Sequence, residues 1–290
     1  MTEDKTYADI HAWIDLWLPT QSEFTAQDVD RELNLSSRTA KQYRWRILEQ
    51  KVKDGILAKM GKNYHVIDKN VDVIDWQNAD VTNVIPLRWP FELEKYIKVF
   101  PKSVCILAGV SGSGKTAFLY EFILRNMRHD MPITLFSNDM GAEEMKERFD
   151  NFKVTIPNPA PWRTVTRYDN FSEVIDPDGI NIIDLLDMDS EYYLIGREIF
   201  LIDKAIRTGM ALIAIQKGAT KTYGQGGDQS RKRAKLYLTM DYNGNAEDNE
   251  PKGLLKIDKS RGRADSSVNP KGMVIDYKLV NGYKFIFTRR

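Results

Sequence analysis

The chain has 290 residues, of which 42% are hydrophobic and 29% are charged. This composition is typical of a soluble globular protein that is long enough for one large domain and a small one. The 42 Lys and Arg residues nearly cancel the 41 Asp and Glu residues, so only local charge clusters can indicate a nucleic-acid partner. The single cysteine excludes an internal disulfide, and the chain shows neither a signal-peptide pattern nor an apolar run of about 20 residues. We therefore expect a cytoplasmic protein without a membrane partner.

The first 68 residues predict three helices followed by a β-hairpin. Apolar residues recur at helical spacing over 7–18, Thr25 can cap a second helix, and a third helix is expected over about 38–53. Two short apolar runs on either side of a Gly-Lys-Asn turn at 61–63 indicate the two strands of a hairpin.

This order of elements resembles the winged helix-turn-helix family of DNA-binding domains over roughly residues 7–68. The resemblance implies that the third helix enters the major groove of duplex DNA. The outward side chains expected on this helix are Arg38, Lys41, Gln42, Arg44 and Arg46. They would supply cations for phosphates and forked or amide groups for base edges. The alternative is a solvated basic face on a domain that binds protein or caps an oligomer.

Residues 69–95 contain two prolines and show no sustained hydrophobic period, which predicts a linker between two domains. Trp76 and Trp89 suggest that this segment packs against something. The linker is expected to lead into an α/β domain over 96–290.

From Phe100 onward, short apolar runs alternate with helical stretches, a pattern that predicts a mostly parallel sheet covered by helices on both faces. The expected strands are 103–108, 133–137, 180–184, 211–215 and 253–257, and the expected helices are 115–127, 142–149 and 192–207. Asn281-Gly282 near the end of the chain marks a C-terminal β-hairpin with a type I′ turn.

Residues 109–116 carry the most specific motif of the chain, G-V-S-G-S-G-K-T. This is a complete G-x-x-x-x-G-K-[ST] phosphate-binding loop between an apolar run and a helical stretch, so we expect the chain to bind ATP with Mg²⁺. Lys115 would reach the β and γ phosphates, and the Thr116 hydroxyl would ligate Mg²⁺. The expected nucleotide-binding residues are Gly109, Val110, Ser111, Gly112, Ser113, Gly114, Lys115, Thr116 and Ala117.

Two aspartates at strand ends are candidates for roles in ATP hydrolysis. Asp139 follows the strand 133–137, which we expect beside the strand of the phosphate loop, and its carboxylate could polarise water for attack on the γ phosphate. Asp184 ends an apolar strand, as expected of a Walker B aspartate that holds Mg²⁺ through its water shell. Asp187 lies past the strand end and is the less favoured choice.

Three further side chains complete the candidate catalytic set. Gln216 follows the strand 211–215 and could sense the γ phosphate, although it could also be an ordinary loop amide. Lys259 and Arg261 lie two positions apart after a strand, on one side of an extended segment. The alternative for this pair is a solvated basic surface.

Residues 86–287 resemble the ATPase domain of the RecA-like superfamily, and within it the DnaB type of replicative helicase. The resemblance lies in F-S-N-D-M with its following helix ending in Arg148, I-I-D-L-L-D-M, A-L-I-A-I-Q-K and K-S-R-G. It implies a homo-oligomeric ring, such as a hexamer, in which Lys259 and Arg261 of one subunit reach the γ phosphate held by its neighbour. It also implies that Asp139 activates water. The family normally has Glu at that position and a helical collar domain in place of the winged helix, and the shorter Asp suits slow turnover.

Between Gln216 and Leu236 the chain is rich in glycine and locally basic. RecA-like proteins carry a DNA-binding channel loop at this place, so the segment could follow the backbone of single-stranded DNA, with Tyr223 stacked on a base. Its candidate DNA contacts are Lys217, Lys221, Arg231, Lys232 and Arg233. The alternative is a disordered, solubilising insertion. Residues 243–252 indicate a plain surface turn.

Together these patterns predict a DNA-binding, Mg²⁺-dependent, oligomeric ATPase of the DnaB/RecA-like class that acts in DNA replication or a related DNA transaction, with helicase or translocase activity as one form. The alternative is an ATP-switched DNA-binding or helicase-loader protein that assembles on ATP but does not translocate. A small-molecule kinase is disfavoured by Gln216 and by the Lys259 and Arg261 pair.

Overall fold

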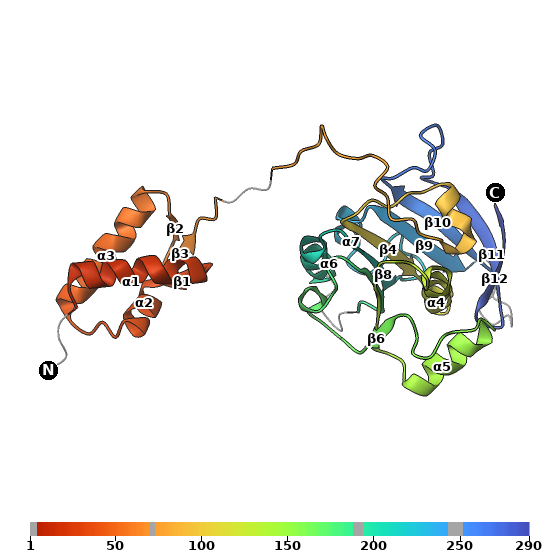
Figure 1. Ribbon diagram of the computed structural model, residues 1–290, viewed down its shortest axis with the longest axis horizontal. Coiled ribbons are helices and arrows are strands. Elements are labelled where there is room, and N and C mark those ends of the chain that lie inside the picture. The colour runs from red at the N-terminus through yellow and green to blue at the C-terminus, as the bar shows by residue number, and fades with distance from the viewer. Residues whose placement is uncertain (1–4, 70–72, 188–193, 243–251, 290) are drawn as a thin grey trace. The chain divides into compact units, whose positions relative to one another are not determined.

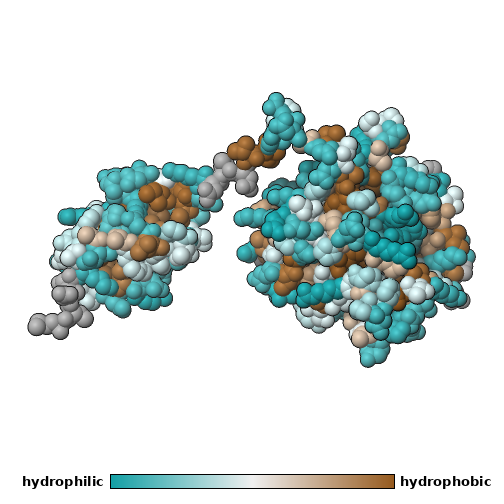
Figure 2. Space-filling model, in the orientation of Figure 1, coloured by the Kyte–Doolittle hydropathy of each residue, from teal (hydrophilic) through white to brown (hydrophobic). Residues whose placement is uncertain are grey.

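A computed structural model describes residues 5–69, 73–187, 194–242 and 252–289 (Figure 1). The chain forms two compact units, Met1–Ala79 and Asp80–Arg290. Within each unit the large apolar side chains are mostly buried, and the face drawn in Figure 2 is largely hydrophilic with hydrophobic residues in separate patches. In the described part of the chain, every helix is too short or too polar to span a membrane.

Over residues 5–69, the first unit contains three helices and a three-stranded antiparallel sheet. Its elements are α1 (Tyr7–Trp17), η1 (Leu18–Thr20), β1 (Glu23–Thr25), α2 (Ala26–Glu32), α3 (Arg38–Lys53), β2 (Leu57–Met60) and β3 (Asn63–Val66). Thr6 and Thr25 cap α1 and α2, each through a reciprocal pair of hydrogen bonds with the aspartate three positions later. The predicted helices and hairpin are confirmed, whereas β1 was not predicted and pairs with β3 in the order β1-β3-β2.

All three helices and the sheet contribute to one buried core in the first unit. Its members are Ile10, Ile14, Leu18, Phe24, Val29, Leu33, Leu35, Ala40, Ile47, Leu48, Leu57 and Tyr64. On α3, the buried Ala40, Ile47 and Leu48 form one stripe at helical spacing. Much of the opposite side of α3 is therefore exposed to solvent.

Within its described residues, the second unit is built on a nine-stranded sheet with the order β12-β11-β10-β9-β4-β8-β7-β5-β6. The strands are β4 (Ser103–Gly109), β5 (Ile133–Ser137), β6 (Arg163–Val165), β7 (Ile180–Asp184), β8 (Met210–Gln216), β9 (Leu236–Tyr242), β10 (Lys252–Ser260), β11 (Val274–Val280) and β12 (Lys284–Arg289). The strands from β9 to β6 in this order are parallel, and β10, β11 and β12 are antiparallel. The expected mostly parallel α/β fold is confirmed.

Helices cover both faces of this sheet (Figure 1). They are α4 (Lys115–Asn126), α5 (Ala142–Asn151), α6 (Leu194–Ala205) and α7 (Asp228–Lys232), with 3₁₀ turns η2 (Pro90–Lys95) and η3 (Phe171–Glu173). Side chains of α4, α5 and η2 share one apolar core with one face of the sheet, and those of α6 share another core with the opposite face. Because both faces are covered, every residue of β4, β5 and β7 is buried, and apolar side chains of these strands point to both faces of the sheet.

The second half of the predicted linker is part of this core, which corrects the boundary at residue 95. Five alternate residues, Ile85, Leu87, Trp89, Phe91 and Leu93, are at most 6% exposed. The Trp89 ring lies 4.7 Å from that of Phe122 on α4. Pro86 and Pro90 fall between these residues, so the alternation does not resemble a strand in the sequence. Trp76, in contrast, is exposed.

Candidate nucleotide-binding site

The phosphate loop lies between β4 and α4, at the carboxyl edge of the parallel strands. Gly109 at the end of β4 is level with Gln216 of β8 and Met240 of β9. Gly112 and Gly114 have φ angles of 73° and 95°, a region in which glycine is not strained. The carboxyl edge of an open α/β sheet is where such folds bind ligands.

Close packing beneath the loop is a second reason, beside the positive φ angles, why glycine occupies positions 112 and 114. A Cβ atom on Gly112 would lie 2.3 Å from Tyr242 Oη, and one on Gly114 would lie 3.0 Å from Leu279 Cδ2. Tyr277 Oη donates a 2.7 Å hydrogen bond to the carbonyl oxygen of Ser113. The loop is thus supported from below by β9 and β11. Two of its N–H groups are already engaged, because Val110 N donates to the Met240 carbonyl oxygen and Ser113 N donates to the Val110 carbonyl oxygen, both at 3.2 Å.

Lys115 is buried at the centre of the site. Its Nζ donates hydrogen bonds to the carbonyl oxygens of Gly109 (2.9 Å) and Val110 (3.0 Å) and to Gln216 Oε1 (3.0 Å). Burial lowers the pKa of Lys115, while the negative charges of Asp184 and Asp139 act to raise it. Phosphate oxygens could replace these three neutral acceptors and would stabilise the ammonium more strongly.

Asp184 and Thr116 form a pair suited to a divalent cation. Asp184 ends β7, is 2% exposed and accepts a hydrogen bond from Thr116. The pKa of Asp184 is raised to about 6, mainly by burial and also by the negative charge of Asp139. Its Oδ2 atom has no hydrogen-bond partner among the described residues. Carboxylate and hydroxyl oxygens are ligands that Mg²⁺ prefers, so this pair fits the predicted metal.

No cluster of three or more His, Cys, Asp or Glu side chains among the described residues could hold a metal by itself. A cation at Thr116 and Asp184 would therefore take its remaining ligands from water and phosphate oxygens, as Mg²⁺ in nucleotide sites commonly does.

Asp139 reaches the site from a strand, β5, whose place in the sheet differs from the expected one. The expectation that β5 lies beside β4 is wrong, because β8 and β7 separate them. Ser137 of β5 is nevertheless level with Asp184 of β7, so the segment after β5 opens at the same sheet edge. Asp139 is exposed there, and its charge acts on both Lys115 and Asp184.

Asn138 and Arg148 contribute to the site without having been predicted to do so. Asn138 Nδ2 donates to the Leu185 carbonyl oxygen (2.9 Å) and Asn138 Oδ1 accepts from Leu185 N (3.3 Å), which ties the ends of β5 and β7 together. Arg148 on α5 pairs with Glu144 at 2.7 Å, and its positive charge opposes the rise in the pKa of Asp184. In the sequence, the only indication of these roles is that Asn138 lies in the F-S-N-D-M segment and Arg148 in the helix that follows it.

Lys259 and Arg261 are not brought to this phosphate loop. Strand β10 is antiparallel to β9, and Gly253 at its start pairs with Tyr242 near the loop, whereas Lys259 pairs with Tyr237 farther down. Arg261 N donates to the Lys235 carbonyl oxygen beyond the start of β9. Both residues therefore lie toward the opposite edge of the sheet from the loop of their own chain.

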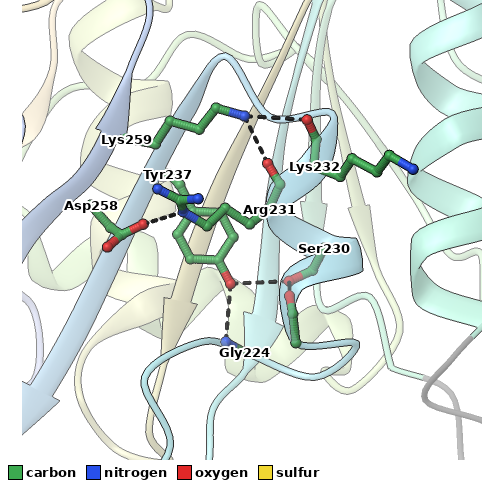
Figure 3. A network of polar contacts seen from close by, with 8 residues as sticks. Gly224, Ser230, Arg231, Lys232, Tyr237, Asp258 and Lys259 are labelled. Carbon is green, nitrogen blue, oxygen red and sulfur yellow. Dashed lines mark hydrogen bonds and ion pairs between the residues drawn. The ribbon is translucent and has the colours of Figure 1, made fainter.

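Lys259 is held by the end of α7 (Figure 3). Its Nζ donates to the carbonyl oxygens of Arg231 (2.9 Å) and Lys232 (3.2 Å). The pKa of Lys259 is lowered to about 8, mainly by burial and also by the nearby positive charges of Arg261, Arg231 and Lys235. The Arg261 side chain, in contrast, is exposed.

The segment after Gln216 is more ordered than the predicted channel loop. Tyr237 Oη accepts a hydrogen bond from Gly224 N (3.0 Å) and lies 3.1 Å from Ser230 Oγ, which anchors the segment and α7 to β9 (Figure 3). Tyr223 lies edge-on to the Tyr237 ring at 5.9 Å. The helix α7 was not predicted.

Several cations proposed for DNA in this segment have protein partners, which corrects their description as free loop cations. Lys217 is buried in an ion pair with Asp241, and Arg231 Nε donates to Asp258 Oδ2 at 2.5 Å. Arg233 lies over the Phe200 ring, 3.7 Å from Asp203. Lys221 and Lys232 are exposed. The acidic partners lie far away in the sequence, so spacing could not reveal them.

On α3 of the first unit, the predicted basic face is present with one exception. Arg38, Lys41, Gln42 and Arg46 are exposed. The expectation that Arg44 points outward is wrong: its side chain is 13% exposed, with Nε 3.3 Å from Asp30 Oδ1 of α2.

Trp45 lies between the exposed α3 cations and is 55% exposed. We name Arg38, Lys41, Gln42, Trp45 and Arg46 the α3 face. Their i, i+3, i+4, i+7, i+8 spacing marks a single helical face and could have identified Trp45 in the sequence.

Comparisons with known proteins leave the family unassigned. No protein-family model and no curated protein sequence matches this chain. Among solved structures, this chain is similar to a KaiC-like protein from the hyperthermophilic archaeon Pyrococcus horikoshii, with 16% sequence identity, a TM-score of 0.49, and coverage of 70% of this chain and 100% of that chain. At this level of identity and overlap, the likeness assigns no activity to this chain.

Proposed function

We propose that the protein is a Mg²⁺-dependent ATPase that binds its nucleotide at the phosphate loop. One observation carries this proposal. Lys115 is hydrogen-bonded to Gln216, and the charges of Asp184 and Asp139 both act on Lys115 at one edge of the sheet. Three different strands deliver these groups around a glycine-rich loop, which is the arrangement that phosphoryl transfer needs.

Each residue has a role in this scheme. Lys115 and the loop N–H groups bind the phosphates, and Thr116 with Asp184 holds Mg²⁺, which when bound neutralises charge on the β and γ phosphates. Asp139 orients the attacking water and accepts its proton. Gln216 loses its hydrogen bond to Lys115 when phosphate arrives, so its position changes with nucleotide occupancy.

The positions of Lys259 and Arg261 favour an oligomer of the DnaB/RecA-like class. Because both residues lie far along β10 from their own phosphate loop, a role in hydrolysis requires the phosphate of a neighbouring subunit. Arg261 is exposed and is the better candidate, whereas Lys259 is bonded to the end of α7. A homo-oligomeric ring would bring Arg261 to the adjacent nucleotide.

The first unit is proposed to be a winged helix-turn-helix domain that binds duplex DNA through the α3 face. The chain order of a helix, a short strand, two helices and a hairpin, with the strands paired as β1-β3-β2, supports this assignment. The support for single-stranded DNA is weaker, because Lys217 and Arg231 are paired with Asp241 and Asp258. Lys221 and Lys232 remain the exposed candidates for that contact.

A second candidate function is an ATP-switched DNA-binding or helicase-loader protein. Two features favour it over a processive helicase or translocase: the shorter carboxylate of Asp139, and the order of the segment that would have to move along a strand. The helicase or translocase and the ATP-switched protein would both act in DNA replication or a related DNA transaction.

The first test is phosphate release from ATP, measured with and without Mg²⁺, for the wild type and Lys115→Ala. We expect Mg²⁺-dependent hydrolysis in the wild type and none in the variant, and equal rates would remove the assignment of the phosphate loop. Native mass measurement with ATP then tests whether the protein assembles, and phosphate release measured with added single-stranded DNA separates a translocase from a switch. A translocase should assemble and be strongly stimulated by the strand, whereas a switch should assemble with little stimulation.

A further inference from the structure

A cavity of about 340 Å³ adjoins the start of α4. It lies between α4, α5 and the turn that joins β11 to β12, and its walls include Thr116, Ala117, Tyr120, Asn151 and Tyr283. Its volume falls at the lower end of the range of about 300–1,000 Å³ for small-molecule sites. None of the roles proposed above uses the part of this cavity away from Thr116.

The cavity is fixed in position relative to the phosphate loop. Thr116 and Ala117, which line it, directly follow the loop lysine. The β11–β12 hairpin is bonded to the loop through Tyr277 Oη and the Ser113 carbonyl oxygen, 2.7 Å apart. A Cβ atom on Gly114 would lie only 3.2 Å from the Phe285 ring of β12. A ligand whose phosphates occupy the loop therefore meets a rigid wall at the hairpin turn.

The aromatic side chains on these walls suit a flat ring. Tyr283 lies in the hairpin turn, and its ring contacts Phe152 at 5.3 Å with an interplanar angle of 61°. This edge-to-face contact supports Tyr283 from one side and leaves its ring available to a second partner. Tyr120 is stacked on Phe149 at 4.1 Å, which holds the floor of the cavity in place.

The polar groups of the cavity suit an uncharged ligand with hydrogen-bond donors. Glu144 and Glu147 add carboxylates to the lining, and Arg148 is already paired with Glu144 at 2.7 Å. Carboxylates accept hydrogen bonds from hydroxyl and amino groups but repel a further phosphate. The Asn151 amide adds both donors and an acceptor.

We propose that this cavity binds the nucleoside of the bound nucleotide, with a purine base stacked on Tyr283 and the ribose close to Ala117. The inference rests on the proposed function, because it requires a triphosphate in the loop. It adds a base-binding residue, Tyr283, from a part of the chain about 170 positions away from the phosphate motif in sequence.

The test compares ATP with inorganic tripolyphosphate, which has the phosphates but no nucleoside. Binding of each is measured by calorimetry for the wild type, Tyr283→Ala, Tyr283→Phe and the control Tyr168→Ala, which alters an exposed tyrosine outside the cavity lining. We expect Tyr283→Ala to weaken ATP about tenfold, since base stacking on an aromatic side chain has that order of effect. Tripolyphosphate binding should not change, and Tyr283→Phe and Tyr168→Ala should match the wild type.

The outcomes separate this inference from the proposed function. If Tyr283→Ala leaves ATP affinity unchanged, or weakens ATP and tripolyphosphate equally, the nucleoside assignment is overturned while the phosphate loop stands. If the wild type binds neither compound, the proposed function itself fails. Photolabelling of the wild type with 8-azido-ATP gives an independent measurement without any variant. Label on the peptides around Phe152 or Tyr283, competed by ATP, supports the assignment, and label elsewhere overturns it.

Discussion

The ammonium group of Lys115 donates a 3.0 Å hydrogen bond to Gln216 Oε1, although the two residues are 101 positions apart in the sequence. The bond joins the phosphate loop to the end of β8. The backbone on either side of Gln216 is also tied in, because Lys217 N donates to the Gly109 carbonyl oxygen at 2.9 Å and Gln225 N donates to the Gln216 carbonyl oxygen at 2.7 Å. A phosphate that draws Lys115 away from Gln216 therefore acts directly on the segment leading to α7.

Changing Gln216 to Glu should weaken ATP binding, whereas changing it to Ala should not. A carboxylate at this position would form an ion pair with Lys115 that phosphate must break, and it would also repel the γ phosphate. We expect a loss of about tenfold or more for Gln216→Glu. Gln216→Ala should keep ATP affinity within about threefold but slow hydrolysis, because only the neutral acceptor is lost. Calorimetry with Mg²⁺-ATP measures the affinity of each variant. Equal affinities for the two variants would contradict the role of Gln216 as a neutral partner of Lys115.

Asp184→Asn should stabilise the nucleotide-free protein and abolish Mg²⁺-dependent hydrolysis. The folded pKa of Asp184 is raised from 3.8 to about 6, so its ionised form opposes folding above that pH. By linkage, the ionised carboxylate lowers the free energy of unfolding by on the order of 3 kcal/mol. The gain in melting temperature should be absent below about pH 4, grow between pH 4 and 6, and stay constant above pH 6. A variant less stable than the wild type at pH 7.5 would refute this account.

Arg261→Ala should preserve ATP binding but lower hydrolysis by about a thousandfold, the effect expected of an arginine that touches a neighbour's phosphate. Mixing this variant with Lys115→Ala should restore part of the activity, because some interfaces then combine an intact loop with an intact Arg261. Arg263→Ala, at an exposed arginine two positions away, is the control and should retain activity. Absence of recovery in mixtures that form mixed oligomers by native mass measurement would rule out action between subunits.

Substituting Lys41 and Arg46 on the α3 face by alanine should weaken binding to duplex DNA. Each lost phosphate contact lowers the slope of log affinity against log salt by about one, so the double variant should lower it by about two. Arg31→Ala on α2 removes a cation that is 76% exposed and should change neither quantity. Fluorescence anisotropy of a labelled duplex at several salt concentrations measures the affinity and its salt slope. An unchanged slope in the double variant would exclude the α3 face as the DNA-binding surface.

Arg44 illustrates where the sequence alone was misleading. Spacing on α3 placed it with the outward cations, but α2 packs against that side and provides Asp30. Lys217 and Arg231 were counted as loop cations in the same way, and their partners Asp241 and Asp258 belong to β9 and β10. In each case an acidic group from another element makes burial of the cation tolerable, and a linear pattern contains no record of that pairing.

The sequence by itself determined the elements whose cause is local: the capped helices, the continuous apolar strands, the Asn-Gly turn and the phosphate loop, whose glycines are required by its own backbone path. Only the tertiary structure decided which strands are neighbours, and so how Asp139, Asp184 and Gln216 reach Lys115. It also decided that alternate residues from 85 to 93 belong to the core, that Lys259 is bonded to α7, and that the hairpin turn with Tyr283 stands beside the loop. The physical reason is that backbone preferences act between residues a few positions apart, whereas desolvation and close packing choose partners by distance in space.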